Sequence, residues 1–423
     1  MIGPAAHTFD PEQSIAESDD QAGILPMLLV VAATLFNAGL ALVNANVTAM
    51  SGNTVILCEV LIVIASHLYI MRHFQARMVN WYFLALGIAI FAVLRISVTE
   101  NVDAKYFRDI FLIVTFILLG MTSNDRRAIQ AMAILQVAVI AGILYEATCV
   151  ECFGSMFAVK DFYMNTRGIG EEEFTNLSSD LYVSATRPEA RFLPFFDLHR
   201  LSSVFLEPVS LGNFMVATLC MTLAYWSRLG LALKALFVSS LVLMLFASDG
   251  RLAALASIAI IIISIGHRLM PRHAALLFVL GVTALAITAT WAFGWQSGVD
   301  DLDGRIAYTA ELFSKLTLID YAGLSDLHLA ESVDAGVVYL ILTQSLLGLI
   351  ALWTAITLSA REERLDQKIY KNGLLLYLSL TMMVSYSFLS IKTAAPVWFV
   401  FGVLLNAAPE SVANLRNAPR RQR

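Results

Sequence analysis

Apolar residues recur along this chain in long runs that are separated by charged residues. A helix needs about 20 apolar residues to cross the roughly 30 Å hydrocarbon core of a bilayer, and many of these runs approach that length. The pattern predicts an all-α, polytopic integral membrane protein with about twelve transmembrane helices. The predicted spans are 24–44, 53–71, 80–98, 107–121, 128–147, 204–226, 232–248, 251–267, 274–293, 333–359, 373–389 and 393–407.

Basic residues in the short connections set the predicted orientation. Because short loops rich in Lys and Arg stay in the cytoplasm, both termini are predicted to be cytoplasmic. Residues 1–23 contain no Lys or Arg and therefore lack the basic start of a cleaved signal peptide; they are expected to be a disordered tail, and 408–423 a basic tail. The basic residues on this side are Arg72, Arg77, Arg126, Arg127, Arg228, Lys234, Arg268, Arg272, Arg361 to Lys371, and Arg416 to Arg423.

Two connections are much longer than the others and are predicted to be external. They are 148–203 and 294–332, within a single membrane domain that comprises 1–423. The first contains several cations, but a loop of that length is translocated largely regardless of its charge. Long loops in a compact protein are usually functional.

Composition narrows the class of protein. With 58% hydrophobic and 14% charged residues, the chain has too little polar surface for a soluble fold. No Gly-rich phosphate loop is visible, so ATP-driven chemistry is not expected.

Cys149 and Cys152 begin the first external loop and predict a local disulfide, while Cys58 and Cys220 lie within spans as inert residues. Asp301 and Asp303 have the spacing of a metal site, but solvated acids are the preferred interpretation.

Ionisable residues gather at the predicted outer ends of the spans. Arg95, Arg108, Glu207, Asp249 and Arg251 all fall there. A single arginine near a helix end commonly extends to the lipid head groups, which is the alternative to a functional role. A carboxylate just inside a span is costly unless it is paired, so Glu207 favours a function.

The segment from Arg200 to Pro208 is the strongest local signal. If it is helical, Arg200 and Glu207 lie seven residues apart on one face, and an ion pair is expected at the membrane surface. That ion pair would either belong to a functional site or act as a structural clamp between two segments. In the second loop, Arg305 begins an amphipathic stretch that ends at Phe313; it is expected to form a short helix on the outer leaflet or an ordinary loop helix.

Three motifs resemble the Wzy-type polysaccharide polymerases and the related O-antigen ligases. They are Arg-x-x-Ser-x-Phe-x-Glu-Pro from Arg200, the turn from Ser248 to Arg251, and the region that runs from Asp303 through Asp334-Ala335-Gly336 to Leu349. The resemblance implies a metal-independent inner-membrane glycosyltransferase that uses polyprenyl-diphosphate-linked sugars on the periplasmic side. The ligases tend to carry a histidine just before the last long span. The corresponding stretch here runs from Glu331 to Gly336 without a histidine, and His328 lies a few residues earlier, which favours a polymerase.

The chemistry of such a transfer assigns roles to the candidates. Arginine binds diphosphate oxygens bidentately, so Arg200, Arg251 and Arg305 are expected to stabilise the leaving group. The general base is expected among Glu207, Asp249 and Asp334. No cofactor and no metal are expected. Further substrate contacts are predicted for Arg95, Arg108, Arg191, His199 and His328.

The leading interpretation is therefore a polymerase of polyprenyl-diphosphate-linked oligosaccharide repeats in the bacterial inner membrane, surrounded by membrane lipid. Export or chain-length machinery is an expected partner, and nucleic acid is not. A lipid-linked oligosaccharide flippase or another twelve-span transporter is the alternative, which Glu59 and His67 within the second span keep open. An O-antigen-ligase-like transferase and an assembly component without chemistry are the remaining alternatives.

Overall fold

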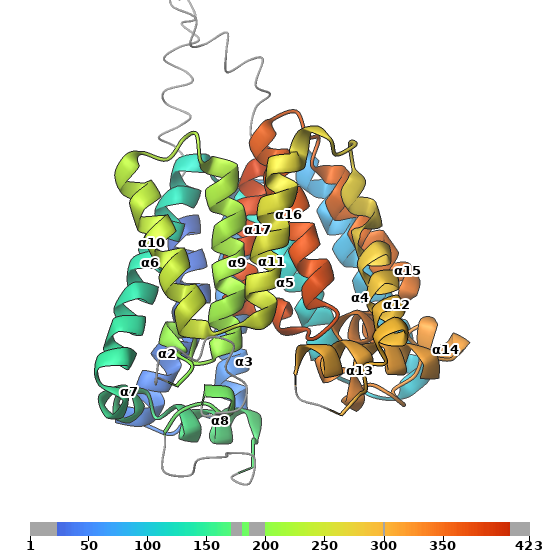
Figure 1. Cartoon of the computed structure of the whole chain (residues 1–423), viewed down its shortest axis with the longest axis horizontal. Coiled ribbons are helices and arrows are strands. Elements are labelled where there is room, and N and C mark those ends of the chain that lie inside the picture. Colours follow the sequence, from blue (N-terminus) through green and yellow to red (C-terminus); the bar gives the residue numbers. More distant parts are fainter. Residues whose placement is uncertain (1–22, 171–179, 186–198, 299–300, 407–423) are drawn as a thin grey trace, which may run out of the picture.

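The computed structural model describes residues 23–170, 180–185, 199–298 and 301–406, and this part of the chain is helical without strands (Figure 1). Candidate Arg191 and the two terminal tails lie outside the described residues. Helices stand at every position where a span is predicted. They are α2 (Leu25–Asn46), α3 (Gly52–Arg72), α4 (Val79–Thr99), α5 (Ala104–Met121), α6 (Asp125–Thr148), α9 (Pro208–Tyr225), α10 (Leu231–Ser248), α11 (Arg251–Ile265), α12 (Phe278–Phe293), α15 (Gly336–Ser359), α16 (Leu365–Thr381) and α17 (Ile391–Asn406).

Nine helices of the described chain are long and apolar enough to cross a membrane. The three at predicted positions that do not qualify are α5, which contains Lys105, Arg108 and Asp109, and α16 and α17, which have 17 and 16 residues. The fold is therefore compatible with a polytopic membrane protein, and the count of twelve crossings stays a prediction.

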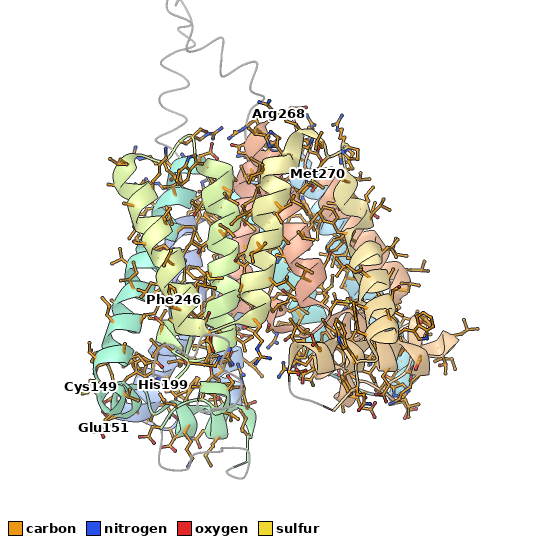
Figure 2. The ribbon with its side chains drawn as sticks, in the orientation of Figure 1. Cys149, Glu151, His199, Phe246, Arg268 and Met270 are labelled. Atoms are coloured by element: carbon orange, nitrogen blue, oxygen red, sulfur yellow. A yellow bond between two sulfur atoms is a disulfide. The ribbon has the colours of Figure 1, made fainter. Side chains whose placement is uncertain are left out.

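Both predicted external loops form short helices at the same end of the bundle, which we call the loop end. The first contains α7 (Val150–Phe157) and α8 (Val159–Arg167), and the second contains α13 (Leu302–Lys315) and α14 (Leu318–Tyr321); Figure 1 shows all four there. In Figure 2, Cys149 and His199 lie at the loop end and Arg268 at the opposite end. Which end faces the cytoplasm stays a prediction.

The core is built around α5, α9 and α17. An added Cβ at Gly120 of α5 would stand 2.1 Å from the Phe399 carbonyl oxygen of α17, and one at Gly402 would stand 2.1 Å from that of Ile117. The two backbones therefore touch, as small residues allow in membrane bundles. The apolar stretch of α9 is 89% buried within the bundle and that of the segment that ends with α12 only 6%, so α12 leaves most of its apolar surface exposed.

The predicted span 333–359 is interrupted. Ser345, inside α15, has φ 65° and ψ 161°, which ends one helical segment and begins another. Its hydroxyl accepts a hydrogen bond from the Gly348 backbone N–H at 3.0 Å and so caps the second segment. Gly323 of the second loop fits against the break, where an added Cβ would lie 2.7 Å from the Ser345 nitrogen. The apolar run gave no sign of this break.

The predicted bounds 373–389 and the predicted loop 361–371 are also wrong. The helix α16 begins at Leu365 and ends at Thr381, so two lysines lie inside it. Lys371 is fully buried and pairs with Glu362, and Lys368 donates to the Met270 carbonyl oxygen at 2.8 Å. These two lysines have partners within the bundle, so their charges do not mark the end of a helix.

We expect the loop end to be outside the cytoplasm. In a variant without the native cysteines, Ser155→Cys on α7 should react with a membrane-impermeant maleimide in intact cells, and Arg361→Cys should react only after permeabilisation, since both positions are exposed. Mass spectrometry of the labelled protein measures both. The reverse pattern would invert the predicted orientation.

Candidate functional site

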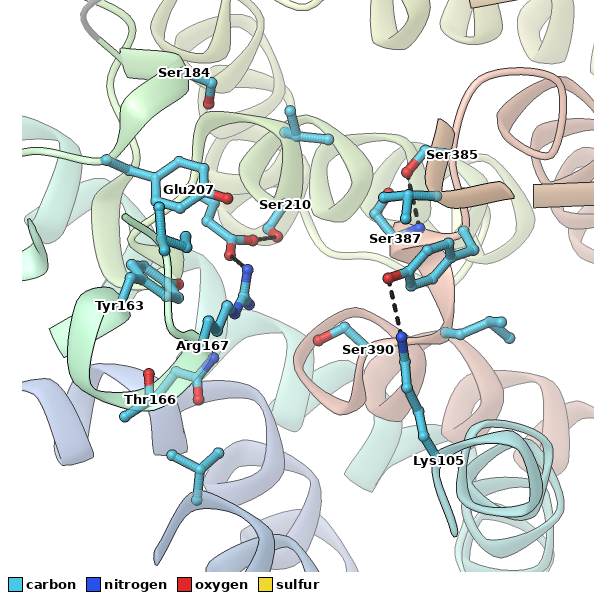
Figure 3. A pocket seen from close by; sticks show the side chains of 18 of the residues that line it. Lys105, Tyr163, Thr166, Arg167, Ser184, Glu207, Ser210, Ser385, Ser387 and Ser390 are labelled. Carbon is cyan, nitrogen blue, oxygen red and sulfur yellow. Dashed lines mark hydrogen bonds and ion pairs between the residues drawn. The ribbon is translucent and has the colours of Figure 1, made fainter. Parts of the chain in front are cut away.

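A cavity of about 620 Å³ opens at the loop end, and we call it the large cavity. Its volume falls within the range of small-molecule sites. Figure 3 shows Tyr163, Arg167 and Glu207 on one wall and Lys105, Ser387 and Ser390 on the opposite wall. Its charged lining residues are Lys105, Arg108, Arg167 and Arg305, with the carboxylates Glu59, Asp109, Glu207 and Asp334.

A second cavity of about 160 Å³, which we call the small cavity, adjoins the large one. Arg305, Ser184 and Ser387 line both, so the two are neighbouring parts of one site. The three arginines that are predicted to stabilise a leaving group, Arg200, Arg251 and Arg305, all line the small cavity, and we call them the clamp arginines. They face two carboxylates, Asp249 and Asp301.

The segment that carries Arg200 is not the helix that the sequence analysis considered. Residues 203–205 form a single 3-10 turn, Leu206 is left-handed with φ 61°, and Glu207 stands at the N-cap of α9. Arg200 and Glu207 therefore do not share a helix face, and that expectation is wrong. The Arg200 Nε donates to the Ser248 carbonyl oxygen at 3.0 Å, which ties the segment to the end of α10.

Glu207 is the centre of an ion-pair cluster. Its Oε1 lies 2.6 Å from Arg167 Nη1 and its Oε2 lies 2.8 Å from Lys392 Nζ, while the Ser210 hydroxyl donates to Oε2 at 2.7 Å. Burial raises the pKa of the Glu207 carboxyl, but the charges of Arg167 and Lys392 outweigh it and hold this pKa well below its usual range. A carboxylate with so low a pKa is a weak base.

The clamp arginines differ in how they are neutralised. Arg305 on α13 has its Nη1 at 3.3 Å from Asp334 Oδ1. Arg251 is the first residue of α11, and its side chain makes no hydrogen bond or ion pair within the part of the chain that the structure describes. Its guanidinium is therefore the cation of the small cavity that is best able to take an external anion.

The α5 wall of the large cavity is a second polar cluster. Arg108 pairs with Glu59 at 3.1 Å and with Asp109 at 2.8 Å, so it does not simply extend to head groups. Lys105 Nζ donates to the Tyr386 hydroxyl at 3.0 Å. These contacts line the cavity with hydroxyl and charged groups next to apolar helix surface.

Three other candidates line neither cavity. Arg95 pairs with Asp326 and donates to the Leu342 carbonyl oxygen at 3.3 Å, which fixes the second loop to α4. The remaining two are His199, whose Nε2 lies 3.0 Å from Glu146 Oε1, and His328, whose Nδ1 lies 3.4 Å from Glu331 Oε2.

Three residues at or beside the large cavity were not predicted from the sequence: Arg167, Lys105 and Lys392. Arg167 and Lys105 line the large cavity, and Lys392 contacts Glu207 from behind. Lys105 and Lys392 stand at predicted outer helix ends, which is the signal that singled out Arg108. Arg167 gives no such signal, because its place depends on how α8 packs.

The disulfide between Cys149 and Cys152 is confirmed, and Cys58 and Cys220 are free. Asp301 caps α13, because its carboxylate accepts from the Gly304 backbone N–H at 2.7 Å. Among the described residues, no group of three or more His, Cys, Asp or Glu side chains is placed to hold a metal ion.

No model of a known protein family, no curated protein and no solved structure matches this chain significantly.

The Glu207–Lys392 pair should contribute strongly to stability. We expect Glu207→Gln to lower the free energy of unfolding by about 3–5 kcal/mol, because it leaves the buried Lys392 without a counter-charge. The double variant Glu207→Gln with Lys392→Met should recover part of this loss. Unfolding in detergent micelles measures both, with Lys315→Met, which breaks an exposed pair, as the control. A double variant less stable than Glu207→Gln would contradict this account.

Proposed function

We propose that this protein is a membrane glycosyltransferase that polymerises saccharides carried on a polyprenyl diphosphate. The observation that carries the proposal is the small, arginine-lined cavity that adjoins a larger polar cavity at the loop end of an apolar bundle. A lipid-linked substrate has the matching parts: an apolar tail, a diphosphate and a glycan.

The small cavity suits the diphosphate. A guanidinium is planar, stays charged and binds phosphate oxygens with two parallel hydrogen bonds. Arg200, Arg251 and Arg305 outnumber the carboxylates Asp249 and Asp301 there, and Asp301 is engaged in capping α13. The cavity thus has a net positive lining next to the membrane.

The large cavity suits the glycan. Carbohydrate hydroxyls need many donors and acceptors at once, and tyrosine rings offer flat apolar surface together with a hydroxyl. The lining provides Tyr163, Tyr182 and Tyr386 as well as Ser210 and Ser390. Its cations are balanced by carboxylates, so the lining has little net charge and suits a polar but uncharged part of the ligand.

The proposed reaction needs no bound metal. An acceptor hydroxyl attacks the anomeric carbon, the bond from that carbon to the diphosphate oxygen breaks, and the hydroxyl proton passes to a carboxylate. The arginines stabilise the charge that grows on the departing diphosphate. We assign the base role to Asp334, which lines the large cavity beside Arg305 and has 48% of its side chain exposed. Glu207 instead holds Arg167 in place.

A carrier of lipid-linked saccharide is the second candidate. The break in α15 at Ser345 favours it, because interrupted helices line the substrate sites of many transporters. The residues at the break, however, line neither cavity.

Reconstitution separates the candidates. Purified protein in liposomes should convert a lipid-linked repeat into longer glycan if it is the enzyme. Movement of the substrate between leaflets without a longer product would indicate the carrier. If neither occurs with a set of lipid-linked repeats of differing sugar composition, an assembly component without chemistry remains.

Arg200→Lys should reduce polymerisation about 100- to 1000-fold, because an ammonium group cannot reproduce a bidentate phosphate contact in the transition state. Arg251→Lys should behave similarly. Turnover in proteoliposomes at equal protein abundance measures both, and Lys315→Arg on the exposed face of α13 serves as the control. Wild-type turnover by Arg200→Lys would remove this residue from the clamp.

Turnover should persist in excess chelator, because guanidinium groups rather than a metal ion are proposed to stabilise the leaving group. Asp301→Asn together with Asp303→Asn should be nearly silent, since asparagine also caps a helix well. The proteoliposome assay with and without chelator tests this. Loss of activity in chelator that a divalent ion restores would make the aspartates a metal site.

A further inference from the structure

A fully buried carboxylate at the end of α6 holds the segment next to Arg200. Glu146 has no exposed surface, and its Oε2 accepts hydrogen bonds from the backbone N–H groups of Ser202 at 2.8 Å and Ser203 at 2.7 Å. Its Oε1 lies 3.0 Å from His199 Nε2. Both oxygens are thus committed to residues on either side of Arg200.

The segment that Glu146 holds is strained. Ser203 has φ 52° and Leu206 has φ 61°, in the left-handed region that L-residues rarely adopt. Such a conformation persists only when the surroundings over-determine it. Here the carboxylate accepts the Ser203 N–H, and the Ser203 hydroxyl donates to the Val139 carbonyl oxygen at 2.8 Å.

The close approach of this turn to α6 depends on a glycine. An added Cβ at Gly142 would lie 2.4 Å from the Ser203 hydroxyl oxygen and 3.1 Å from the Val204 nitrogen. Gly142 and Glu146 are four residues apart on one helix, so they form one surface. The glycine admits the turn and the carboxylate binds it.

On its other side the segment is tied to the end of α10. The Leu201 N–H donates to the Ala247 carbonyl oxygen at 2.8 Å, and the Arg200 side chain donates to that of Ser248. These carbonyls directly precede the turn that leads to Asp249 and Arg251. The segment therefore bridges α6 and α10, with Arg200 at the small cavity.

We propose that Glu146 is a positioning residue that fixes Arg200 in the small cavity by holding the backbone of residues 202 and 203. This inference rests on the proposed function for the role of Arg200. Glu146 itself lines neither cavity, so it would act through Arg200 rather than by contact with a substrate.

Kinetics test the role. Glu146→Leu removes the carboxylate that accepts from Ser202 and Ser203 and should lower kcat about 100-fold through misplacement of Arg200, with KM nearly unchanged. In an Arg200→Ala background, the same change should cause no further loss, because both substitutions remove one interaction. Independent, multiplicative losses would overturn the inference.

Gly142→Ala provides a second variant that keeps the carboxylate. Its Cβ should push the turn from α6 and reproduce the loss in kcat, again without effect when Arg200 is alanine. Gly39→Ala in α2 is the matched control, because nothing lies within 4 Å of the added Cβ. Equal activity of the two alanine variants would also contradict the inference.

Amide hydrogen exchange separates this inference from the proposed function. In Glu146→Leu, the amides of Ser202 and Ser203 should exchange faster than in the wild type, whether or not the protein has polymerase activity. Unchanged exchange would overturn the positioning role. Faster exchange together with a normal rate for Arg200→Ala would show that Glu146 holds the backbone of residues 202 and 203 but that Arg200 takes no part in the reaction. That result would also remove the positioning role of Glu146.

Discussion

The requirement that a charge within an apolar bundle be paired determines much of this structure. An isolated buried ion costs several kcal/mol, and removing one partner of a buried pair is correspondingly destabilising. Lys392 and Glu207 join α17 to the start of α9, Arg95 joins α4 to the second loop through Asp326, and Arg108 joins α5 to α3 through Glu59. These pairs fix the loop end to the long helices of the bundle. Arg251, at the small cavity, has no such partner among the described residues, which singles it out for an external anion.

The loop end also concentrates unfavourable backbone conformations. Ser203, Leu206 and Asp249 all have positive φ, and each borders the segments that present the clamp arginines. Conformations of this kind cost of order 1–3 kcal/mol each and recur at binding sites. Hydrogen bonds that Glu146 and the carbonyl oxygens at the end of α10 accept from this segment offset part of that cost. Rigid placement of arginines in a cavity is what a pre-organised diphosphate site requires.

The sequence predicted the features that depend on neighbours along the chain. Apolar runs placed the helices, and the spacing of Cys149 and Cys152 indicated their disulfide. It failed where distant segments decide the outcome. Lys371 lies inside α16 because Glu362 pairs with it, and α15 is broken at Ser345 where Gly323 packs. Arg167 and Glu207 meet only because the last residue of α8 lies beside the N-cap of α9, and no local pattern predicts that contact.

The central claim is that a lipid diphosphate occupies the small cavity and its glycan the large one. The most direct measurement is a cryo-electron microscopy structure in nanodiscs with a phosphonate analogue of a polyprenyl-diphosphate-linked saccharide, whose sugar cannot be transferred. This account predicts phosphorus density among Arg200, Arg251 and Arg305, with saccharide density between Tyr163 and Tyr386. A bound analogue whose diphosphate lies away from all three arginines, or no bound analogue at saturating concentration, would contradict it.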